Sequence, residues 1–144
     1  MRRPLVLLIA CLLSPGVKAD LADLLGGTPA VLRPEQAFAP QLVAAADGRL
    51  AVQFRIAPGH YLYRDRLQLT DAKGAPLHPQ LPPGELYDDP EFGPVAVLRG
   101  EQTVHLDLPA LAGATIGLRY QGCAQGRLCY APVGLRLSLP EQSR

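Results

Sequence analysis

The sequence contains no tryptophan, a single methionine at its start, and only five tyrosines and three phenylalanines among its 144 residues. An antibody-type core packs a tryptophan against a disulfide that joins distant strands, so this class is excluded. Runs of like charge are also absent, and a formal net charge of +1 makes nucleic acids and anionic membranes poor candidate partners. No segment of useful length shows helical periodicity, and no apolar run approaches the ~20 residues that cross a bilayer.

The first nineteen residues have the three parts of a secretory signal peptide. Arg2 and Arg3 form a basic start, residues 5–13 are an uninterrupted apolar run, and Val17-Lys18-Ala19 supplies small residues for cleavage. We therefore predict a signal peptide at residues 1–19 and export to the periplasm. The mature chain would keep 11 basic and 13 acidic residues, a formal charge of −2.

The stretch LIAC at residues 8–11 offers a second interpretation, a lipoprotein cleavage box with Cys11 as the lipidated residue. The signal ahead of Cys11 would then be unusually short, so cleavage after Ala19 is favoured. That cleavage removes Cys11 and leaves one pair, Cys123 and Cys129, in a compartment where disulfides persist.

Short segments in which apolar and polar residues alternate indicate half-buried antiparallel strands. In LAVQFRI, residues 50–56, every second side chain is apolar and shares one face, and Asp47-Gly48 before it is a hairpin signal. PEQAF, residues 34–38, is expected to form one helical turn because proline suits the first helical position. The predicted strands cover 39–45, 50–56, 61–70 (bent), 95–99, 103–108, 115–120 and 133–139.

This pattern of short strands, punctuated by 15 prolines and 14 glycines, predicts an all-β fold in the form of an antiparallel β-sandwich. We assign residues 20–33 to a flexible lead-in, 34–140 to the sandwich domain, and 141–144 to a frayed tail.

The loop YQGCAQGRLCYAP, residues 120–132, holds the cysteine pair. As a structural clip the disulfide would close a loop of only seven residues. In the chain-entropy model it would stabilise the folded state by about 2.4 kcal/mol, about half of what a disulfide across a long loop gives. A working dithiol needs one reachable sulfur and a tightly turning backbone, which Gly122 and Gly126 permit, and Arg127 is a nearby cation that favours a thiolate. The spacing alone leaves both interpretations open.

A metal site would need two ligands besides the cysteines, and the chain offers three histidines. His105 lies between the apolar residues of its strand, so its side chain should point to solvent, and His78 is predicted to lie in a loop. Only His60 lies near aromatic residues, and one histidine does not complete a site. We therefore predict neither a metal nor another cofactor.

The cysteine loop resembles the active-site signature of the N-terminal periplasmic domain of the thiol:disulfide interchange protein DsbD, which reads Tyr-Gln-Gly-Cys, five residues, Cys-Tyr-Pro-Pro. HYLYRDRLQL, residues 60–69, resembles a Tyr-Tyr-Leu-Tyr-Arg strand of that family, and LPPGELYDDPEFG, residues 81–93, resembles its cap segment. AGATIGLRYQGC and LRPEQAF match two further segments, so the similarity spans residues 31–139.

The resemblance implies an immunoglobulin-like β-sandwich with a redox-active pair, in which Cys129 forms the disulfide with a partner and Cys123 resolves it. It also implies a role for Asp89 in handling protons during exchange. On their own, Asp89 would be an ordinary turn residue and the strand tyrosines ordinary half-buried aromatics. The implied supporting residues of the site are Tyr61, Tyr63, Asp89, Phe92, Tyr120 and Tyr130.

Two features depart from the family pattern. The family cap commonly reads Asp-Glu-Phe-aromatic-Gly, and its first aromatic covers the disulfide, whereas residues 89–93 of this chain read Asp-Pro-Glu-Phe-Gly. Glu91 thus stands where the shielding ring is expected, so either Phe92 takes that role or the shield is weaker. Pro90 should stiffen the loop, and Ala131 replaces the first proline after the second cysteine.

The function implied by the resemblance is that of a periplasmic electron relay, a component of a protein-disulfide reductase system. Such a domain takes electrons from a thioredoxin-like donor and passes them to exported thioredoxin-fold oxidoreductases. Full-length relatives continue into a membrane region and a thioredoxin-like domain, so we expect the donor to be a separate membrane reductase chain. We expect the protein to be a monomer.

Two other functions remain open from the sequence. One is a non-catalytic binding or scaffold module with an inert local disulfide. The other keeps the fold and changes the client, as in copper handling or cytochrome c assembly. The absence of methionine after Met1 disfavours direct copper binding and says nothing about clients.

Overall fold

The computed structural model describes residues 30–140, so the predicted signal peptide, Cys11, most of the lead-in and the tail at 141–144 lie outside the described residues. The described chain begins with the single helical turn α2 (Pro34–Phe38), as predicted, and continues almost entirely as strands. Within residues 30–140, no helix is long and apolar enough to span a membrane.

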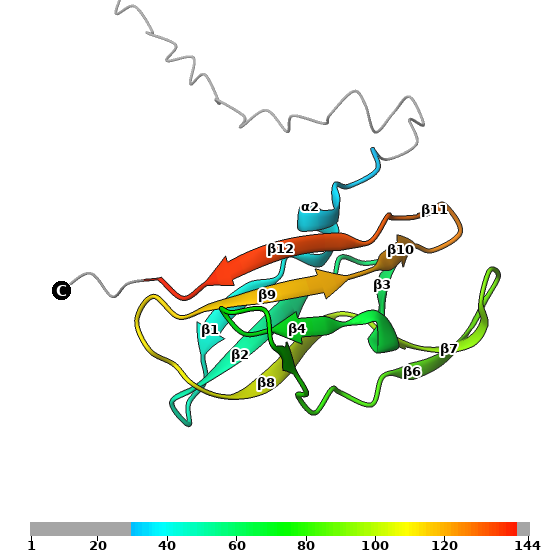
Figure 1. Cartoon of the computed structure of the whole chain (residues 1–144). Coiled ribbons are helices and arrows are strands. Elements are labelled where there is room, and N and C mark those ends of the chain that lie inside the picture. The colour runs from blue at the N-terminus through cyan, green and yellow to red at the C-terminus, as the bar shows by residue number, and fades with distance from the viewer. Residues whose placement is uncertain (1–29, 141–144) are drawn as a thin grey trace, which may run out of the picture. The chain divides into compact units, whose positions relative to one another are not determined.

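The strands of the described residues form three antiparallel sheets (Figure 1). The first sheet has the order β1 (Gln41–Ala44), β2 (Arg49–Arg55), β8 (Glu101–Pro109). The second has the order β12 (Val133–Ser138), β9 (Thr115–Tyr120), β4 (Gln68–Thr70), β5 (Pro76–Leu77). The third, which we call the site sheet, has the order β11 (Leu128–Cys129), β10 (Gly122–Ala124), β3 (His60–Tyr63), β7 (Gly93–Leu98), β6 (Glu85–Asp89).

The apolar core lies between the first and second sheets. On β2, Leu50, Val52 and Phe54 are at most 2% exposed, and on β9, Ile116 and Leu118 are at most 3% exposed. These side chains belong to one contiguous cluster, and they occupy the apolar face that the alternation predicts. The structure thereby confirms the predicted all-β, antiparallel β-sandwich.

Residues 61–70, predicted as one bent strand, are divided between two strands in the structure. A 3-10 turn, η1 (Arg64–Arg66), separates these strands, and the Leu67 N–H closes this turn by donating to the Arg64 C=O over 3.2 Å. As a result β3 joins the site sheet, whereas β4 joins the second sheet. The turn η1 therefore links β3, the strand that carries Tyr61 and Tyr63, to β4 in the second sheet.

Two segments that sequence patterns do not identify as strands complete the site sheet. Residues 85–89 form β6, which pairs with β7 as a hairpin in which Asp89 faces Gly93. We call the tip of this hairpin, residues 88–93, the cap. The cysteine segment, predicted as a loop, is the short hairpin β10–β11. Figure 1 shows both hairpins extending toward the same end of the sandwich.

Candidate redox site

The two cysteines lie directly opposite each other on the hairpin β10–β11, and their sulfurs form a disulfide. Beside them the Tyr130 N–H donates to the Gly122 C=O over 2.9 Å, which leaves Cys123 and Cys129 at a non-hydrogen-bonded position of the hairpin. Facing residues approach most closely at such positions, and the two Cα atoms are 4.0 Å apart. Strand register therefore brings the two sulfurs together.

Gly122 and Gly126 serve different purposes in this hairpin. Gly126 lies in the turn with a φ of +69°, a left-handed conformation that favours glycine, as the prediction of a tight turn requires. Gly122 lies within β10, where an added Cβ would be 2.3 Å from the Tyr61 carbonyl oxygen and 2.6 Å from the Phe38 ring. Gly122 thus permits close packing beneath the disulfide and takes no part in the turn itself.

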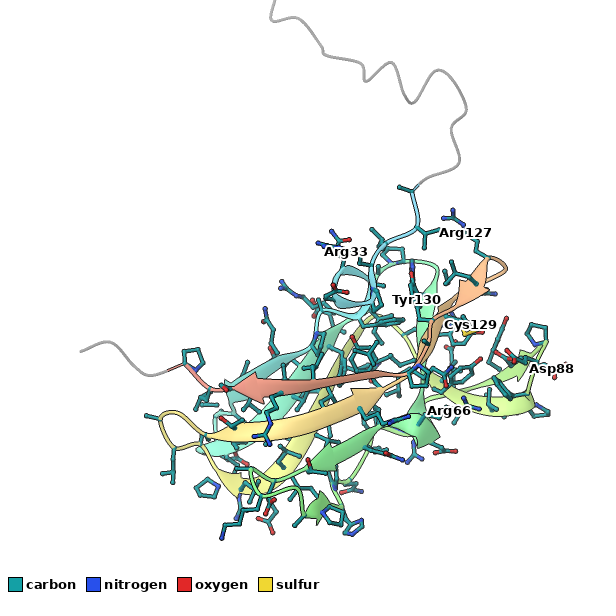
Figure 2. All side chains as sticks on the ribbon, turned by 45° about the horizontal axis from the view of Figure 1, so that its top comes forward. Arg33, Arg66, Asp88, Arg127, Cys129 and Tyr130 are labelled. Atoms are coloured by element: carbon teal, nitrogen blue, oxygen red, sulfur yellow. A yellow bond between two sulfur atoms is a disulfide. The ribbon has the colours of Figure 1, made fainter. Side chains whose placement is uncertain are left out.

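The two sulfurs differ in how a partner could reach them. β10 lies between β11 and β3, and Cys123 is 1% exposed, whereas β11 is the edge strand of the site sheet and Cys129 is exposed. Figure 2 shows Cys129 at the same end of the sandwich as Arg66 and Asp88. Because exchange requires in-line attack on a sulfur, Cys129 is the more accessible of the two sulfurs for such an attack.

Two tyrosines of β3 lie against the disulfide. Tyr61 is the register partner of Cys123, and Tyr63, two residues further along the strand, shares its face. The Tyr63 hydroxyl oxygen is 3.1 Å from the Cys123 Sγ and 3.7 Å from the Cys129 Sγ. A disulfide sulfur carries no proton, so the sulfurs face the oxygen of a hydroxyl whose own proton is directed elsewhere.

That proton is directed to Asp89, the one charged side chain that is buried among the described residues, at 3% exposed. Its Oδ2 accepts hydrogen bonds from the hydroxyls of Tyr61 (2.6 Å) and Tyr63 (2.8 Å). Its Oδ1 accepts hydrogen bonds from the backbone N–H groups of Glu91 (2.9 Å) and Phe92 (3.1 Å). The Asp89 carboxylate thus holds both the two tyrosines and the backbone of the cap.

These contacts set the protonation states of the site. Burial alone would raise the pKa of Asp89, but the four donated hydrogen bonds outweigh it and lower that pKa below its ordinary value. Burial, together with the hydrogen bond to Asp89, raises the pKa of Tyr63 to about 12. The same two causes raise the pKa of Tyr61 further. At neutral pH the site therefore contains an aspartate anion and two neutral tyrosines.

In the cap, Phe92 is the residue whose ring packs toward the site. Phe92 is 41% exposed, and its ring meets the Tyr63 ring edge-on, with centroids 5.5 Å apart. Pro90 and Glu91 are exposed at the tip. The cap aromatic of this chain therefore contacts Tyr63, whose hydroxyl lies beside both sulfurs.

Comparison with known proteins places this geometry in a family. A family model described as the N-terminal domain of the thiol:disulfide interchange protein DsbD matches residues 28–140. The chain belongs to the DsbD N-terminal domain family.

Individual relatives agree with this assignment. DsbD 2 of Pseudomonas aeruginosa is 41% identical over 143 residues, which are 95% of this chain and 24% of that protein. The chain thus spans about a quarter of the length of such curated relatives. The crystal structure of the reduced DsbD N-terminal domain of Neisseria meningitidis is 32% identical, with a TM-score of 0.65 over 78% of this chain and 92% of that one.

A second Neisseria meningitidis structure, a complex between the DsbD N-terminal and PilB N-terminal domains, is 31% identical with a TM-score of 0.61. It covers 78% of this chain and 94% of that one. These DsbD domains share the immunoglobulin-like sandwich, so the fold expected from the resemblance is confirmed.

The two tyrosines that flank the DsbD-type loop lie in different surroundings. Tyr120 is 1% exposed in the main core, where its ring meets Phe38 and Phe54 edge-on at 5.5 Å and 6.1 Å. Its hydroxyl is buried without a hydrogen-bond partner among the described residues. Tyr130 stacks on His60, and its hydroxyl donates to the Leu32 C=O over 2.8 Å. Both tyrosines pack beside the hairpin, whereas the hydroxyl that lies against the sulfurs is that of Tyr63.

Sequence reasoning missed two arginines that contact the aromatic residues of the site. The Arg99 guanidinium carbon is 4.9 Å from the Tyr61 ring centroid and 5.2 Å from that of Tyr87. The Arg66 guanidinium carbon lies 4.2 Å from the Phe92 centroid. Arg66 lies in the turn η1 and Arg99 directly follows β7. Arginines at such positions carry no local signal, because a stacked guanidinium depends on segments distant in sequence.

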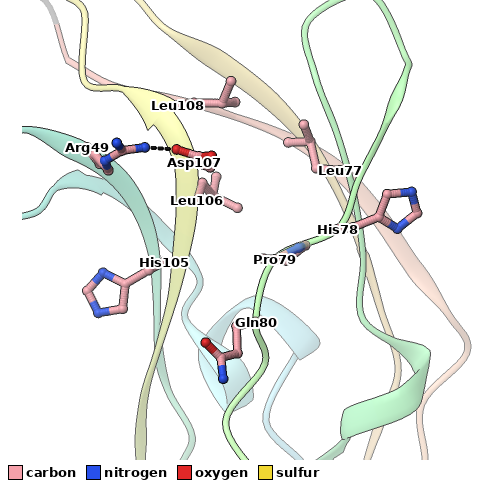
Figure 3. A pocket seen from close by; sticks show the side chains of 9 residues that line it. All are labelled: Arg49, Leu77, His78, Pro79, Gln80, His105, Leu106, Asp107 and Leu108. Atoms are coloured by element: carbon pink, nitrogen blue, oxygen red, sulfur yellow. Dashed lines mark ion pairs between the residues drawn. The ribbon is translucent and has the colours of Figure 1, made fainter.

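The histidines are dispersed in the described part of the chain. His105 is exposed on β8 and His78 is exposed in the loop after β5, as predicted. Both line a surface pocket beside the first sheet, but their imidazoles point in opposite directions (Figure 3). His60 lies instead on β3, with its Nδ1 3.0 Å from the Pro58 C=O. The pocket contains an ion pair between Arg49 and Asp107 and no cysteine.

Proposed function

We propose that this protein is a periplasmic thiol–disulfide exchange domain that relays electrons through Cys123 and Cys129. Its donor would be a thioredoxin-like domain of a membrane reductase, and its acceptors exported thioredoxin-fold oxidoreductases. The single observation that carries the proposal is the asymmetric disulfide, with an exposed Cys129 on an edge strand and a buried Cys123 beside Tyr63. Membership of the DsbD N-terminal family supports it.

Reduction of the domain follows from this asymmetry. A donor thiolate attacks the Cys129 Sγ, the bond to Cys123 breaks, and Cys123 leaves as a thiolate that takes up a proton. The second donor thiol then attacks its own partner sulfur in the mixed disulfide. The donor departs as a disulfide, and Cys129 is released and protonated. Two electrons and two protons have then passed to the pair.

Delivery reverses these roles. The Cys129 thiolate attacks a client disulfide and displaces one client thiolate, which gives a mixed disulfide between Cys129 and the client. Cys123 then attacks the Cys129 Sγ, restores the internal bond and releases the reduced client. Cys129 is therefore the residue that contacts the partner, and Cys123 is the resolving residue.

Tyr63 and Asp89 fit a role in proton handling during this cycle. The Tyr63 hydroxyl donates to Asp89, so its oxygen is free to accept a hydrogen bond from a Cys123 thiol only 3.1 Å away. A buried anion one hydroxyl from the sulfur also disfavours a thiolate at Cys123. We propose that the two residues keep Cys123 protonated in the reduced domain until a mixed disulfide forms.

A trapping experiment tests the assignment of the two sulfurs. Reduced Cys123→Ala protein is mixed with an exported thioredoxin-fold protein in its disulfide form, and mixed disulfides are identified by mass spectrometry. We expect a stable adduct through Cys129, and far less adduct from Cys129→Ala, whose remaining sulfur is buried. Absence of an adduct with Cys123→Ala, or an equal yield from both variants, contradicts the proposed roles.

The reduction potential separates the relay from a module with an inert disulfide. Structural disulfides have potentials below about −300 mV, whereas thioredoxin-fold exchange proteins lie at roughly −120 to −270 mV. We expect the reduction potential of the Cys123–Cys129 pair, measured by equilibration with a glutathione or dithiothreitol buffer, to fall in the second range. A reduction potential below about −300 mV favours the module with an inert disulfide.

A further inference from the structure

Arg66 ends the turn η1 between β3 and β4, at the end of the sandwich that also carries Cys129 and the cap (Figure 2). Its guanidinium carbon lies 4.2 Å from the Phe92 ring centroid and 5.0 Å from the Tyr63 ring centroid. These distances are within the range of cation–π attraction to both rings. Since the two rings also meet edge-on, Arg66, Tyr63 and Phe92 form one cluster.

The same guanidinium is bound to the hairpin that carries the disulfide. Its Nη1 donates to the Gln121 Oε1, and the Gln121 Nε2 donates to the Tyr130 C=O over 3.1 Å. Gln121 lies two residues before Cys123, and Tyr130 directly follows Cys129. Arg66 therefore contacts the cap through Phe92 and the cysteine hairpin through Gln121 at the same time.

The composition of the cap explains why such a link matters in this chain. The cap backbone is held through the N–H groups of Glu91 and Phe92 on Asp89. Its one aromatic residue, Phe92, is 41% exposed, and among the described residues its ring interacts only with the Tyr63 ring and the Arg66 guanidinium. Glu91, one position earlier, supplies a charged and exposed side chain. The Phe92 ring is thus positioned by the Arg66 guanidinium together with the Tyr63 ring.

We propose that Arg66 is a positioning residue that holds the cap against the cysteine hairpin and so restricts the access of small thiols to Cys129. The proposal rests on the proposed function only in giving this restriction a purpose, the avoidance of wasteful exchange in an oxidising compartment.

The test compares Arg66→Ala with Arg55→Ala, which removes the same charge from an exposed position of β2 in the first sheet. The second-order rate constant for reduction of the disulfide by dithiothreitol is measured at pH 7. Hydrogen exchange of the Glu91 and Phe92 amides is followed in parallel. Loss of two cation–π contacts and one charge-assisted hydrogen bond is expected to accelerate reduction roughly tenfold in Arg66→Ala, equivalent to about 1.4 kcal/mol.

The direction of the effect identifies its cause. A cation near Cys129 attracts an attacking thiolate, so if Arg66 acted only through its charge, its removal would slow reduction. We expect faster reduction, faster exchange of the two cap amides, an intermediate rate for Arg66→Lys, and a wild-type rate for Arg55→Ala. Phe92→Ala should reproduce the acceleration, and the double variant should be no faster than either single one, because both changes remove the same contact.

A rate for Arg66→Ala within twofold of the wild type, or slower, overturns the proposal, as does additive acceleration in the double variant. Because dithiothreitol replaces the partner protein, these outcomes do not depend on the relay. Failure of the relay is detected separately, as a missing mixed disulfide between Cys123→Ala protein and thioredoxin-fold proteins.

Discussion

Replacement of Asp89 by asparagine probes the group that holds the site together. The carboxylate accepts four hydrogen bonds, and asparagine offers only one, uncharged oxygen in the same space. Two donors therefore lose their acceptor, and the other two keep only a neutral one. Hydrogen bonds to charged groups contribute about 1.5–3 kcal/mol each. The amide can still donate to the two tyrosine oxygens, and the cost of burying a charge disappears. We therefore expect a net loss of about 2–3 kcal/mol in the free energy of unfolding at pH 7.

The pH dependence gives this prediction its sharpest form. The folded-state pKa of Asp89 is lowered from its ordinary value of 3.8, so its stabilisation is fully present above that value. The stabilisation is lost as the pH falls through the folded pKa. The difference between the wild type and Asp89→Asn should thus be largest at neutral pH and shrink below about pH 4.

Urea unfolding followed by far-ultraviolet circular dichroism is a suitable assay, because the chain has no tryptophan. Asp88→Asn, at the exposed neighbouring position, is the matched control and should change stability by less than about 0.5 kcal/mol. An equal loss for Asp89→Asn at pH 7 and pH 3, or no loss at pH 7, would refute the reasoning.

Two further predictions concern the packing behind the site. Tyr120→Phe removes a buried hydroxyl that has no hydrogen-bond partner among the described residues, so it should raise the free energy of unfolding by about 1 kcal/mol. Tyr130→Phe loses the hydrogen bond to the Leu32 C=O, so it should lower the free energy of unfolding by a similar amount. The same sign for both variants in urea titrations would contradict this account. Gly122→Ala places a methyl group 2.3 Å from the Tyr61 carbonyl oxygen and should cost about 1–3 kcal/mol, while Gly134→Ala, which meets nothing within 4 Å, serves as its control. Equal melting temperatures for the two alanine variants would show that β10 can move away from β3 at no cost.

The sequence determined the sandwich and the pair of cysteines on which the site depends. Alternation in residues 50–56 predicted a buried face because side chains in a strand alternate between two sides, and burial followed that period at Leu50, Val52 and Phe54. The cysteine loop and the tyrosines of HYLYR were identified by their resemblance to a family. Such signals are local, or consist of residue types at fixed spacing, and a linear pattern is enough to read them.

Only the tertiary structure decided how those residues act together. It divided residues 61–70 between two sheets, turned the cysteine loop into a hairpin with Cys123 inside and Cys129 outside, and buried Asp89 under two tyrosines. It also placed Arg66 between the cap and the hairpin. Each of these facts depends on which strands pair and which edge stays open. Those choices are made by contacts between residues far apart in the chain, which a short window of sequence does not contain.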